Sequence, residues 1–516
     1  MNRSASPQNR TSIDYLIRKG SIITIITLVS RPLGYIREAI QAYLFGATLL
    51  VDAFVIAFNF PEMIQTLFFS GATSAFLVPV CSRYLKEKEE FSRIYATFIN
   101  LSIIVTVAVS LVFFLLSSDI MKLIAPGFQA DGRETARILF LIMIPVIGLH
   151  AVLSVMKAFL NAREHFAAPE LSGILWNILF ILFALALSGK IGIYSLAVGV
   201  SVGSLAQVLF QIPYLRNHGI RYSLSLSIHH PAMGEAKRLF TGALIATSIV
   251  PINSFVGRII ASYLPSGEVA SLSYAFRIFI LPFSLFAVPV YTVLFSKISG
   301  LYHDKDWKGI REHIDSSLVL LCVTLIPATI FLCCMGDTFV KLLYQRGAFS
   351  AHDTFITYKA LFGYSVGLIF YALSISFVRI FNAFHDVKTP ALIGITSIIL
   401  NVLLAYLLMM PLKNLGISLA TSIVSFYNFA LLFLVFKKRS GYRMGRTTRR
   451  DIIKSLLAGI LAALLMIGIR KVSGAHSYPA FAAGFAAAAG VYGVLFKNYY
   501  LGYLRRRRGG QNQGRE

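Results

Sequence analysis

The stretch INLSIIVTVAVSLVFFLLSS, Ile99–Ser118, decides the class of fold because it is almost wholly apolar and carries no charged side chain. A helix needs about 20 such residues to cross the hydrocarbon core of a bilayer. Similar blocks recur along the 516-residue chain, among them ILFLIMIPVIGLHAVLSVM (Ile138–Met156) and LLCVTLIPATIFLCC (Leu320–Cys334). Only 14% of the residues are charged, against about 25% in soluble domains. The sequence predicts an all-α polytopic membrane protein.

The apolar blocks number about fourteen when they are counted as membrane spans. We expect two pseudo-symmetric six-helix lobes followed by two C-terminal helices. The predicted segments are a cytoplasmic N-terminus (1–19), an N-lobe with the first six spans (20–238), a C-lobe with the next six (239–436), a basic cytoplasmic linker (437–450), an appended pair of spans (451–500) and a basic cytoplasmic tail (501–516).

Two halves of the chain resemble each other at a nearly constant offset. FLNAREHFAAP (Phe159–Pro169) recurs as IFNAFHDVKTP (Ile380–Pro390), and APGF before the fourth span recurs as RGAF before the tenth. Single residues match at the same offset, namely Arg37 with Arg258, Gly46 with Gly267 and Pro61 with Pro282. An even number of spans separates the pairs, which predicts parallel repeats with a site between the lobes, as in many transporters.

The net charge of +25 is unevenly distributed along the chain. Most of the 48 Lys and Arg fall in the termini and in alternate loops. By the positive-inside rule, this asymmetry predicts that both termini are cytoplasmic. The basic segments adjoin the spans, so we expect anionic membrane lipids as partners. Nucleic acid is not expected, because no basic domain with interleaved aromatic residues is present.

Several charges fall inside the predicted spans, where each costs about 2.5–3.5 kcal/mol at mid-membrane. Lysines near span ends can extend to the interface, but Arg31 and Arg277 are too deep for that. One interpretation is an ion-pair network that only fixes helix packing. The other is a cationic central cavity for a polyanionic ligand, since guanidinium groups suit phosphate oxygens. The candidate cavity residues are Arg31, Arg37, Asp52, Glu62, Arg258 and Arg277, with hinges at Pro32, Gly34 and Pro61.

Enzyme signatures are missing from the sequence. It contains no G-x-S-x-G, H-E-x-x-H or P-loop motif, and its ten histidines are scattered along the chain. Its four cysteines lack metal-ligand spacing, so we predict neither a metal site nor a disulfide framework. We expect no cofactor, although the sequence leaves a bound sodium or chloride ion open.

Four stretches carry a resemblance to a known family: SRPLGYIREA (Ser30–Ala39), FGATLLVDAFVIAFNFPE (Phe45–Glu62), LSYAFRIFILP (Leu272–Pro282) and RIFNAFHDVKTP (Arg379–Pro390). The chain resembles the MurJ (MviN) lipid II flippases, within the MATE-like exporter superfamily of multidrug, oligosaccharidyl-lipid and polysaccharide exporters. With the SAFLVPV and APGF stretches and the two extra spans, the resemblance covers nearly the whole chain.

This resemblance implies fourteen spans, with a terminal pair that forms a groove for a lipid tail. It also implies alternating access that moves the undecaprenyl-pyrophosphate-linked peptidoglycan precursor from the cytoplasmic to the outer leaflet. The family's essential cavity residues match Arg31, Arg37, Asp52 and Arg277. Departures occur at Gln65, where many members have an arginine and which we include in the cavity, at Ser70 (usually Glu), at Phe276 (commonly acidic) and at Arg258, an added charge.

Three functions therefore compete. The first is a lipid II flippase that serves peptidoglycan and cell-wall biogenesis. The second is an exporter of another polyprenyl-linked glycan or of a drug, although a cation-drug exporter should have a net acidic cavity. The third is a non-transporting scaffold among cell-wall synthesis proteins, which would tolerate loss of the cavity charges.

Overall fold

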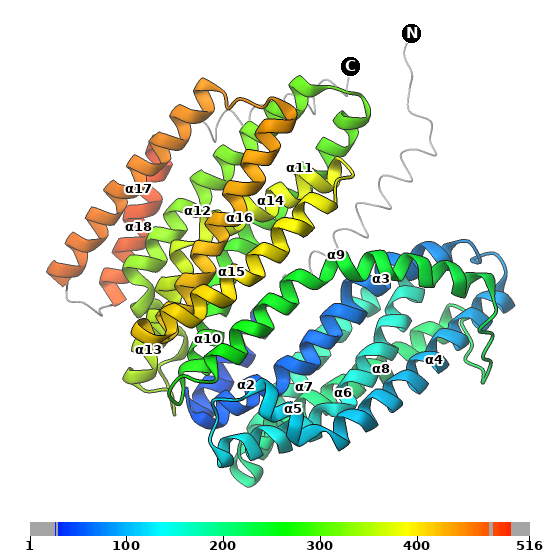
Figure 1. Ribbon diagram of the computed structural model, residues 1–516. Coiled ribbons are helices and arrows are strands. Elements are labelled where there is room, and N and C mark those ends of the chain that lie inside the picture. The colour runs from blue at the N-terminus through cyan, green and yellow to red at the C-terminus, as the bar shows by residue number, and fades with distance from the viewer. Residues whose placement is uncertain (1–25, 27–28, 474–477, 497–516) are drawn as a thin grey trace. The chain divides into compact units, whose positions relative to one another are not determined.

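A computed structural model describes residues 26, 29–473 and 478–496, in which helices and short connections account for the whole fold (Figure 1). Residues 29–45 are helical. The helices that follow are α2 (Leu49–Ile64), the π-helix η1 (Gln65–Ser70), α3 (Gly71–Ser82), α4 (Lys88–Leu115), α5 (Ser117–Ile124), α6 (Ala130–Ala162), α7 (Ala167–Ile191), α8 (Tyr194–Asn217), α9 (Pro231–Ala261), α10 (Glu268–Pro282), the π-helix η2 (Phe283–Ala287), α11 (Val288–His303), α12 (Trp307–Tyr344), α13 (Ala351–Val366), α14 (Leu368–Ala383), α15 (Lys388–Leu412), α16 (Asn414–Ser440), α17 (Arg446–Ser473) and α18 (Tyr478–Leu495).

Ten helices in the described part of the chain are long and apolar enough to cross a membrane. They become eleven when α13 and α14, which meet at a 47° bend, count as one span. The all-helical membrane fold is thus confirmed. The predicted total of fourteen is not confirmed, because residues near both ends of the chain and the side chains of residues 241–250 lie outside the described part.

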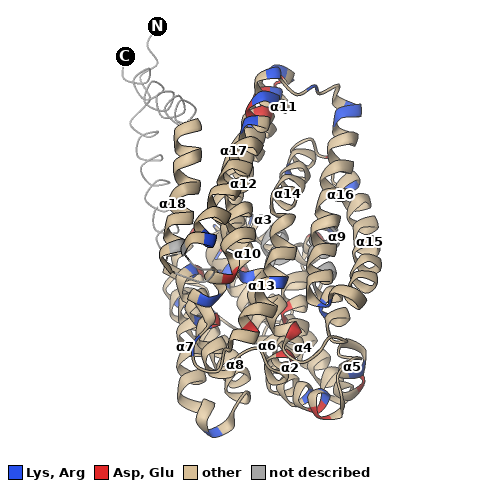
Figure 2. Cartoon of the chain, turned by 90° about the vertical axis from the view of Figure 1, so that its left-hand side faces the viewer, with Lys and Arg blue, Asp and Glu red and all other residues tan. Residues whose placement is uncertain are grey.

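Charge is arranged along the helices as a membrane protein requires. In Figure 2, long stretches of helix are free of charged residues, and Lys, Arg, Asp and Glu gather mainly near helix ends. The C-terminal half of α4 also exposes apolar side chains. Ile104, Leu111 and Leu115 each expose more than half of their surface. Such exposed apolar side chains are expected where lipid is the solvent.

The helices form two compact units. The first comprises Met1–Ala270 together with Arg346–Phe349, and the second comprises Ser271–Gln345 and Ser350–Glu516. Helix α9, which the sequence analysis assigned to the C-lobe, packs with α2, η1 and α3 of the first unit. The predicted lobe boundary at residue 238 rests on the sequence repeat and stays a prediction.

The internal repeat is visible in the backbone. Glu164 after α6 and His385 after α14 both adopt a left-handed conformation, each with φ of 59°. In both, the next amide donates to a carbonyl five residues back, from His165 to Leu160 (2.9 Å) and from Asp386 to Phe381 (3.0 Å). This is the Schellman end of a helix, which usually needs glycine. The two halves therefore share local backbone geometry as well as sequence.

Pro61 does not break the helix in the second predicted span. Helix α2 continues through this proline to Ile64, and the backbone then widens into the π-helix η1 before α3 begins. The repeat behaves alike, since Pro282 ends α10 and the π-helix η2 follows directly. Such π segments occur frequently at functional sites.

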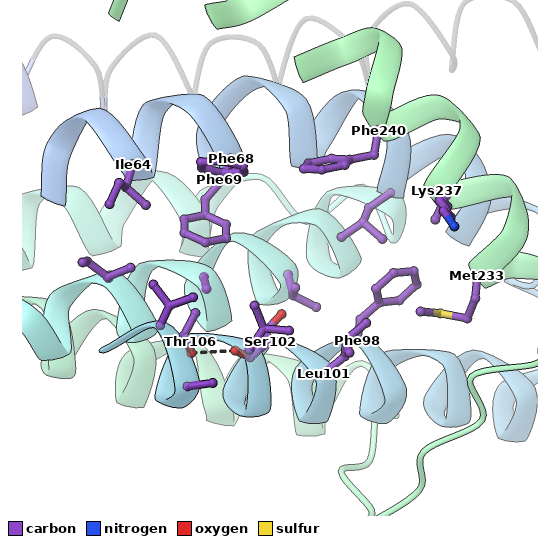
Figure 3. A pocket seen from close by; sticks show the side chains of 18 of the residues that line it. Ile64, Phe68, Phe69, Phe98, Leu101, Ser102, Thr106, Met233, Lys237 and Phe240 are labelled. Carbon is purple, nitrogen blue, oxygen red and sulfur yellow. Dashed lines mark hydrogen bonds between the residues drawn. The ribbon is translucent and has the colours of Figure 1, made fainter. Parts of the chain in front are cut away.

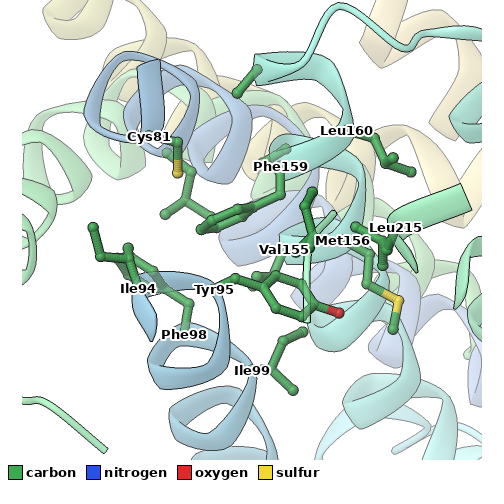
Figure 4. Packing of buried hydrophobic residues seen from close by; sticks show 14 of the residues in the cluster. Cys81, Ile94, Tyr95, Phe98, Ile99, Val155, Met156, Phe159, Leu160 and Leu215 are labelled. Atoms are coloured by element: carbon green, nitrogen blue, oxygen red, sulfur yellow. The ribbon is translucent and has the colours of Figure 1, made fainter. Parts of the chain in front are cut away.

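The core of the first unit is built around Phe159 of α6 (Figure 4). Its ring lies 5.0 Å from that of Phe91 and 5.2 Å from that of Tyr95, both in near edge-to-face geometry. Cys81 of α3 and Leu215 of α8 complete the same buried cluster. Helices α3, α4, α6 and α8 are therefore held together at this end by aromatic packing.

In the second unit, α17 and α18 pack along α12. Arg470 of α17 forms an ion pair with Asp337 of α12 and donates to the Cys334 carbonyl (2.7 Å). The Tyr492 hydroxyl of α18 donates to the Ser455 carbonyl of α17 (2.7 Å). These polar contacts tie the terminal helices to the bundle, where apolar surface alone gives little specificity in lipid.

Candidate functional site

Arg37 is held on the helix 29–45 by charge and by aromatic rings. Its Nη2 donates to Glu38 Oε1 at 2.6 Å, and the two side chains are only 12% and 10% exposed. Its guanidinium carbon lies 4.9 Å from the Trp176 ring centroid and 5.4 Å from that of Phe180, both on α7. A cation over an aromatic face is stabilised by the quadrupole of the ring. Arg37 therefore has an enclosed, compensated environment.

Arg258 and Glu62 form a second, more open ion pair. Arg258 Nη1 on α9 lies 4.0 Å from Glu62 Oε2 on α2, with the side chains 28% and 36% exposed. Gln65 begins η1, three residues after Glu62, and is partly exposed. These three residues, all predicted from the sequence, lie on the α2–η1 segment and the facing α9. Their exposure leaves them accessible to a ligand.

Asp52 is almost fully buried, with 1% of its surface exposed. Its Oδ2 accepts the Gly267 N–H at 2.6 Å, and its Oδ1 accepts the Ala270 N–H at 2.7 Å. Gly267 precedes α10, so the carboxylate caps the first turn of that helix, where backbone donors lack partners. The structure thus gives Asp52 a backbone-capping role, and its predicted contact with a ligand stays untested.

Two matched loops of the first unit make reciprocal contacts within it. Gly127 of the APGF loop donates its N–H to Ser262 Oγ (3.2 Å), just after α9. Ala348 of the RGAF loop donates to the Tyr43 carbonyl (2.8 Å), near the end of helix 29–45. Each loop thus touches the first helix of the opposite repeat. A side chain at Gly127 would meet the Ser262 carbonyl oxygen at 2.4 Å, so glycine is required for this approach.

Arg31 is exposed on the helix 29–45, which continues through the predicted hinges Pro32 and Gly34 without leaving the α-helical state. Arg277 lies on α10 in the second unit and is half-buried. The Phe276 ring, at a position of departure from the family, packs 5.5 Å from the ring of Tyr364. The side chain of Ser70, another departure, lies outside the described residues.

Sequence reasoning missed the aromatic partners of Arg37 and the loop contacts. Trp176 is one of only two tryptophans in the chain, and tryptophan is the best ring for a cation, so its rarity was an available signal. The matched loops APGF and RGAF were recognised as a repeat, but the repeat alone does not say what each loop touches.

The comparison with protein families decides the assignment. Residues 41–489 match the model described as "Lipid II flippase MurJ", which is most of the chain. The chain belongs to the MurJ family. The match spans α2 to α18 and includes the Glu62–Arg258 pair and the Asp52 cap.

Curated relatives agree over nearly their whole length. The chain is 27% identical over 496 residues to a probable lipid II flippase MurJ of Rickettsia prowazekii, covering 95% of this chain and 92% of that protein. It is 28% identical to the Vibrio cholerae protein of the same description, covering 86% of this chain and 87% of that one.

Among solved structures, a lipid II flippase MurJ in an inward closed conformation matches with a TM-score of 0.81 and 26% identity. The match covers 93% of this chain and 99% of the solved chain. An inward-facing multidrug MATE transporter matches with a TM-score of 0.68 at 14% identity, which shows a shared fold alone. The family and fold are those of a multi-pass membrane transporter.

Proposed function

We propose that this chain moves lipid II, the undecaprenyl-pyrophosphate-linked peptidoglycan precursor, from the cytoplasmic to the outer leaflet by alternating access. The observation that carries the proposal is the partly exposed Arg258–Glu62 pair in a chain of the MurJ family. A partly exposed arginine that lies 4.0 Å from its carboxylate can bind a further anion. A polyanionic cargo provides one.

We assign the arginines two roles, according to how enclosed each one is. Arg37 is enclosed by Glu38 and two rings, and it positions helix 29–45 against α7. Arg31 and Arg258 are more exposed, and we assign to them the contact with the pyrophosphate. Guanidinium groups match phosphate oxygens with paired hydrogen bonds. Arg277 of the second unit is proposed to add a further charge.

The remaining assignments complete the proposal. The chain transports and does not catalyse, it lies in the bacterial plasma membrane with both termini cytoplasmic, and it needs no cofactor. The basic linker 437–450 binds anionic lipids. Cell-wall synthesis proteins are proposed as further partners.

The test is depletion of the protein in a bacterium, followed by identification of the lipid-linked precursor that accumulates in the membrane. We expect lipid II to accumulate, and wild-type protein to reverse this. Arg31→Ala and Arg258→Ala should not reverse it at equal membrane levels. Arg216→Ala, an exposed arginine at the end of α8, is the matched control and should behave as wild type. Accumulation of another polyprenyl-linked glycan would assign that cargo instead.

A further inference from the structure

A cavity of about 1090 Å³ lies within the first unit, among η1 and α3, α4, α6 and the first half of α9 (Figure 3). Its walls are apolar, with Phe68, Phe98 and Phe240 facing it. The Thr106 hydroxyl donates back to the Ser102 carbonyl (2.5 Å), so it satisfies the helix backbone. Ligand pockets usually measure about 300–1,000 Å³. The cavity therefore suits a long hydrocarbon chain.

Helix α4 is flanked by apolar space on two sides. A second cavity of about 720 Å³ lies along α4, lined by Ile103, Val107 and Pro145 among others. Thr106 lines both cavities. Apolar space that is open to lipid chains thus flanks the middle of this helix, while Phe113 near its C-terminal end packs on Phe60 of α2 (5.2 Å between ring centroids).

The π-helix η1 shapes the larger cavity. Phe68 and Phe69 are consecutive, and both line it. A π-helix has more residues per turn than an α-helix, which changes the angle between successive side chains. The irregular helix thus supplies two adjacent aromatic walls.

The segment RYSLSLSIHH, Arg221–His230, covers one end of α4 with an alternating pattern. The Ser223 and Ser225 carbonyls accept hydrogen bonds from Asn100 Nδ2 at 3.1 and 2.8 Å. Leu224 between them is 91% exposed, and Ile228 further along lines the cavity. A segment that binds the protein through its backbone carbonyls and exposes leucine side chains is suited to the membrane interface.

Among the described residues that line the cavity, Lys237 of α9 carries the only charge, and it lies at the end where Met233 and Phe240 close the wall (Figure 3). Lys237 and its neighbour Arg238 are both exposed. We propose that an acyl chain of an anionic phospholipid occupies this cavity with its phosphate at Lys237. The apolar walls receive the chain, and the ammonium attracts the headgroup. This site is separate from the proposed cargo contacts.

The experiment uses the full chain in nanodiscs of mixed phosphatidylglycerol and phosphatidylethanolamine, released into detergent and weighed by native mass spectrometry. The wild type should retain phosphatidylglycerol in preference to phosphatidylethanolamine. Lys237→Ala should lower that retention about fivefold, the loss of one membrane-surface cation. Ala108→Trp, which fills the cavity from an exposed position on α4, should abolish it.

Matched controls separate the site from general lipid binding. Ile104→Trp lies on the same helix but outside the cavity lining, and Lys190→Ala removes an exposed lysine at the end of α7. Both should retain phosphatidylglycerol as the wild type does. Equal retention in all five proteins would overturn the proposal. Displacement of the phospholipid by undecaprenyl phosphate at equal concentration would also overturn it, since the cavity would then hold a prenyl tail.

Discussion

The Asp52 carboxylate on α2 accepts two backbone N–H groups, those of Gly267 and Ala270, across 215 and 218 residues of sequence. Hydrogen bonds to a charged acceptor contribute about 1.5–3 kcal/mol each. The start of α10 is therefore capped by a side chain of α2. Asp52 is a mechanical link in the first unit.

Removing the Asp52 carboxylate should lower the stability of the fold. Asp52→Ala leaves two buried backbone donors without their acceptor, so we expect the unfolding free energy to fall by about 3 kcal/mol. Asp52→Asn keeps one acceptor oxygen and should lose less. Thermal unfolding in detergent measures the effect. Asp131→Ala, an exposed acidic residue in the first turn of α6, is the control, and equal melting of Asp52→Ala and Asp131→Ala would contradict the capping role.

The loop contact at Gly127 offers a steric test. A methyl group at Gly127 would lie 2.4 Å from the Ser262 carbonyl oxygen, so Gly127→Ala must push the APGF loop off the end of α9. We expect lower thermal stability and loss of flippase complementation. Gly300→Ala, inside α11 with open space around the added carbon, should be neutral or stabilising because alanine favours helix. Equal melting temperatures of the two variants would show that the contact between Gly127 and Ser262 does not contribute to stability.

The effects of substitutions at Arg37 and Glu38 on stability should not be additive, because the two side chains form a buried ion pair. Arg37→Ala removes the guanidinium that Glu38 binds at 2.6 Å, and breaking a buried ion pair typically costs about 3–5 kcal/mol. Replacing both residues by leucine removes both charges and should restore much of that stability. Arg37→Lys keeps the charge but loses the planar contact with Trp176, so a loss of about 1 kcal/mol is expected. Unfolding midpoints of the three variants decide this, and a double variant no better than Arg37→Ala would refute it.

The Glu62–Arg258 pair should behave differently, because its atoms are 4.0 Å apart and its side chains are partly exposed. A double-mutant cycle with alanine should give a coupling below about 1 kcal/mol in stability. We nevertheless expect Arg258→Ala to abolish complementation, since its proposed role is to bind cargo. A coupling of several kcal/mol with full complementation would show that the pair only fixes packing.

The membrane class and the repeat could be predicted because both depend on the sequence alone: the first on runs of apolar residues, the second on residues that match at a constant offset. The APGF and RGAF loops, for example, were paired correctly by sequence alone. A span of about 20 apolar residues has few alternatives in lipid. The same logic identified Arg37, Asp52 and Glu62 as charges that need an explanation.

The partners of those charges could not be predicted. From the sequence, Asp52 was predicted to face a ligand. In the structure it instead accepts hydrogen bonds from the Gly267 and Ala270 amides, which follow α9. A sequence pattern does not show which backbone amides a side chain will bind. Arg37 meets Trp176 because α7 folds beside helix 29–45, which periodicity cannot specify. Sequence therefore located the unusual residues, and tertiary structure determined what each one does.

Membrane orientation remains a prediction of the positive-inside rule and has a direct test. In a background with the four native cysteines replaced, single cysteines at Asp131 and Ser266 should react with an impermeant thiol reagent added outside intact cells. Cysteines at Glu87 and Arg443 should react only after the membrane is opened. All four positions are exposed in the structure, so burial does not limit labelling. The reverse pattern would invert the topology and, with it, the proposed direction of transport.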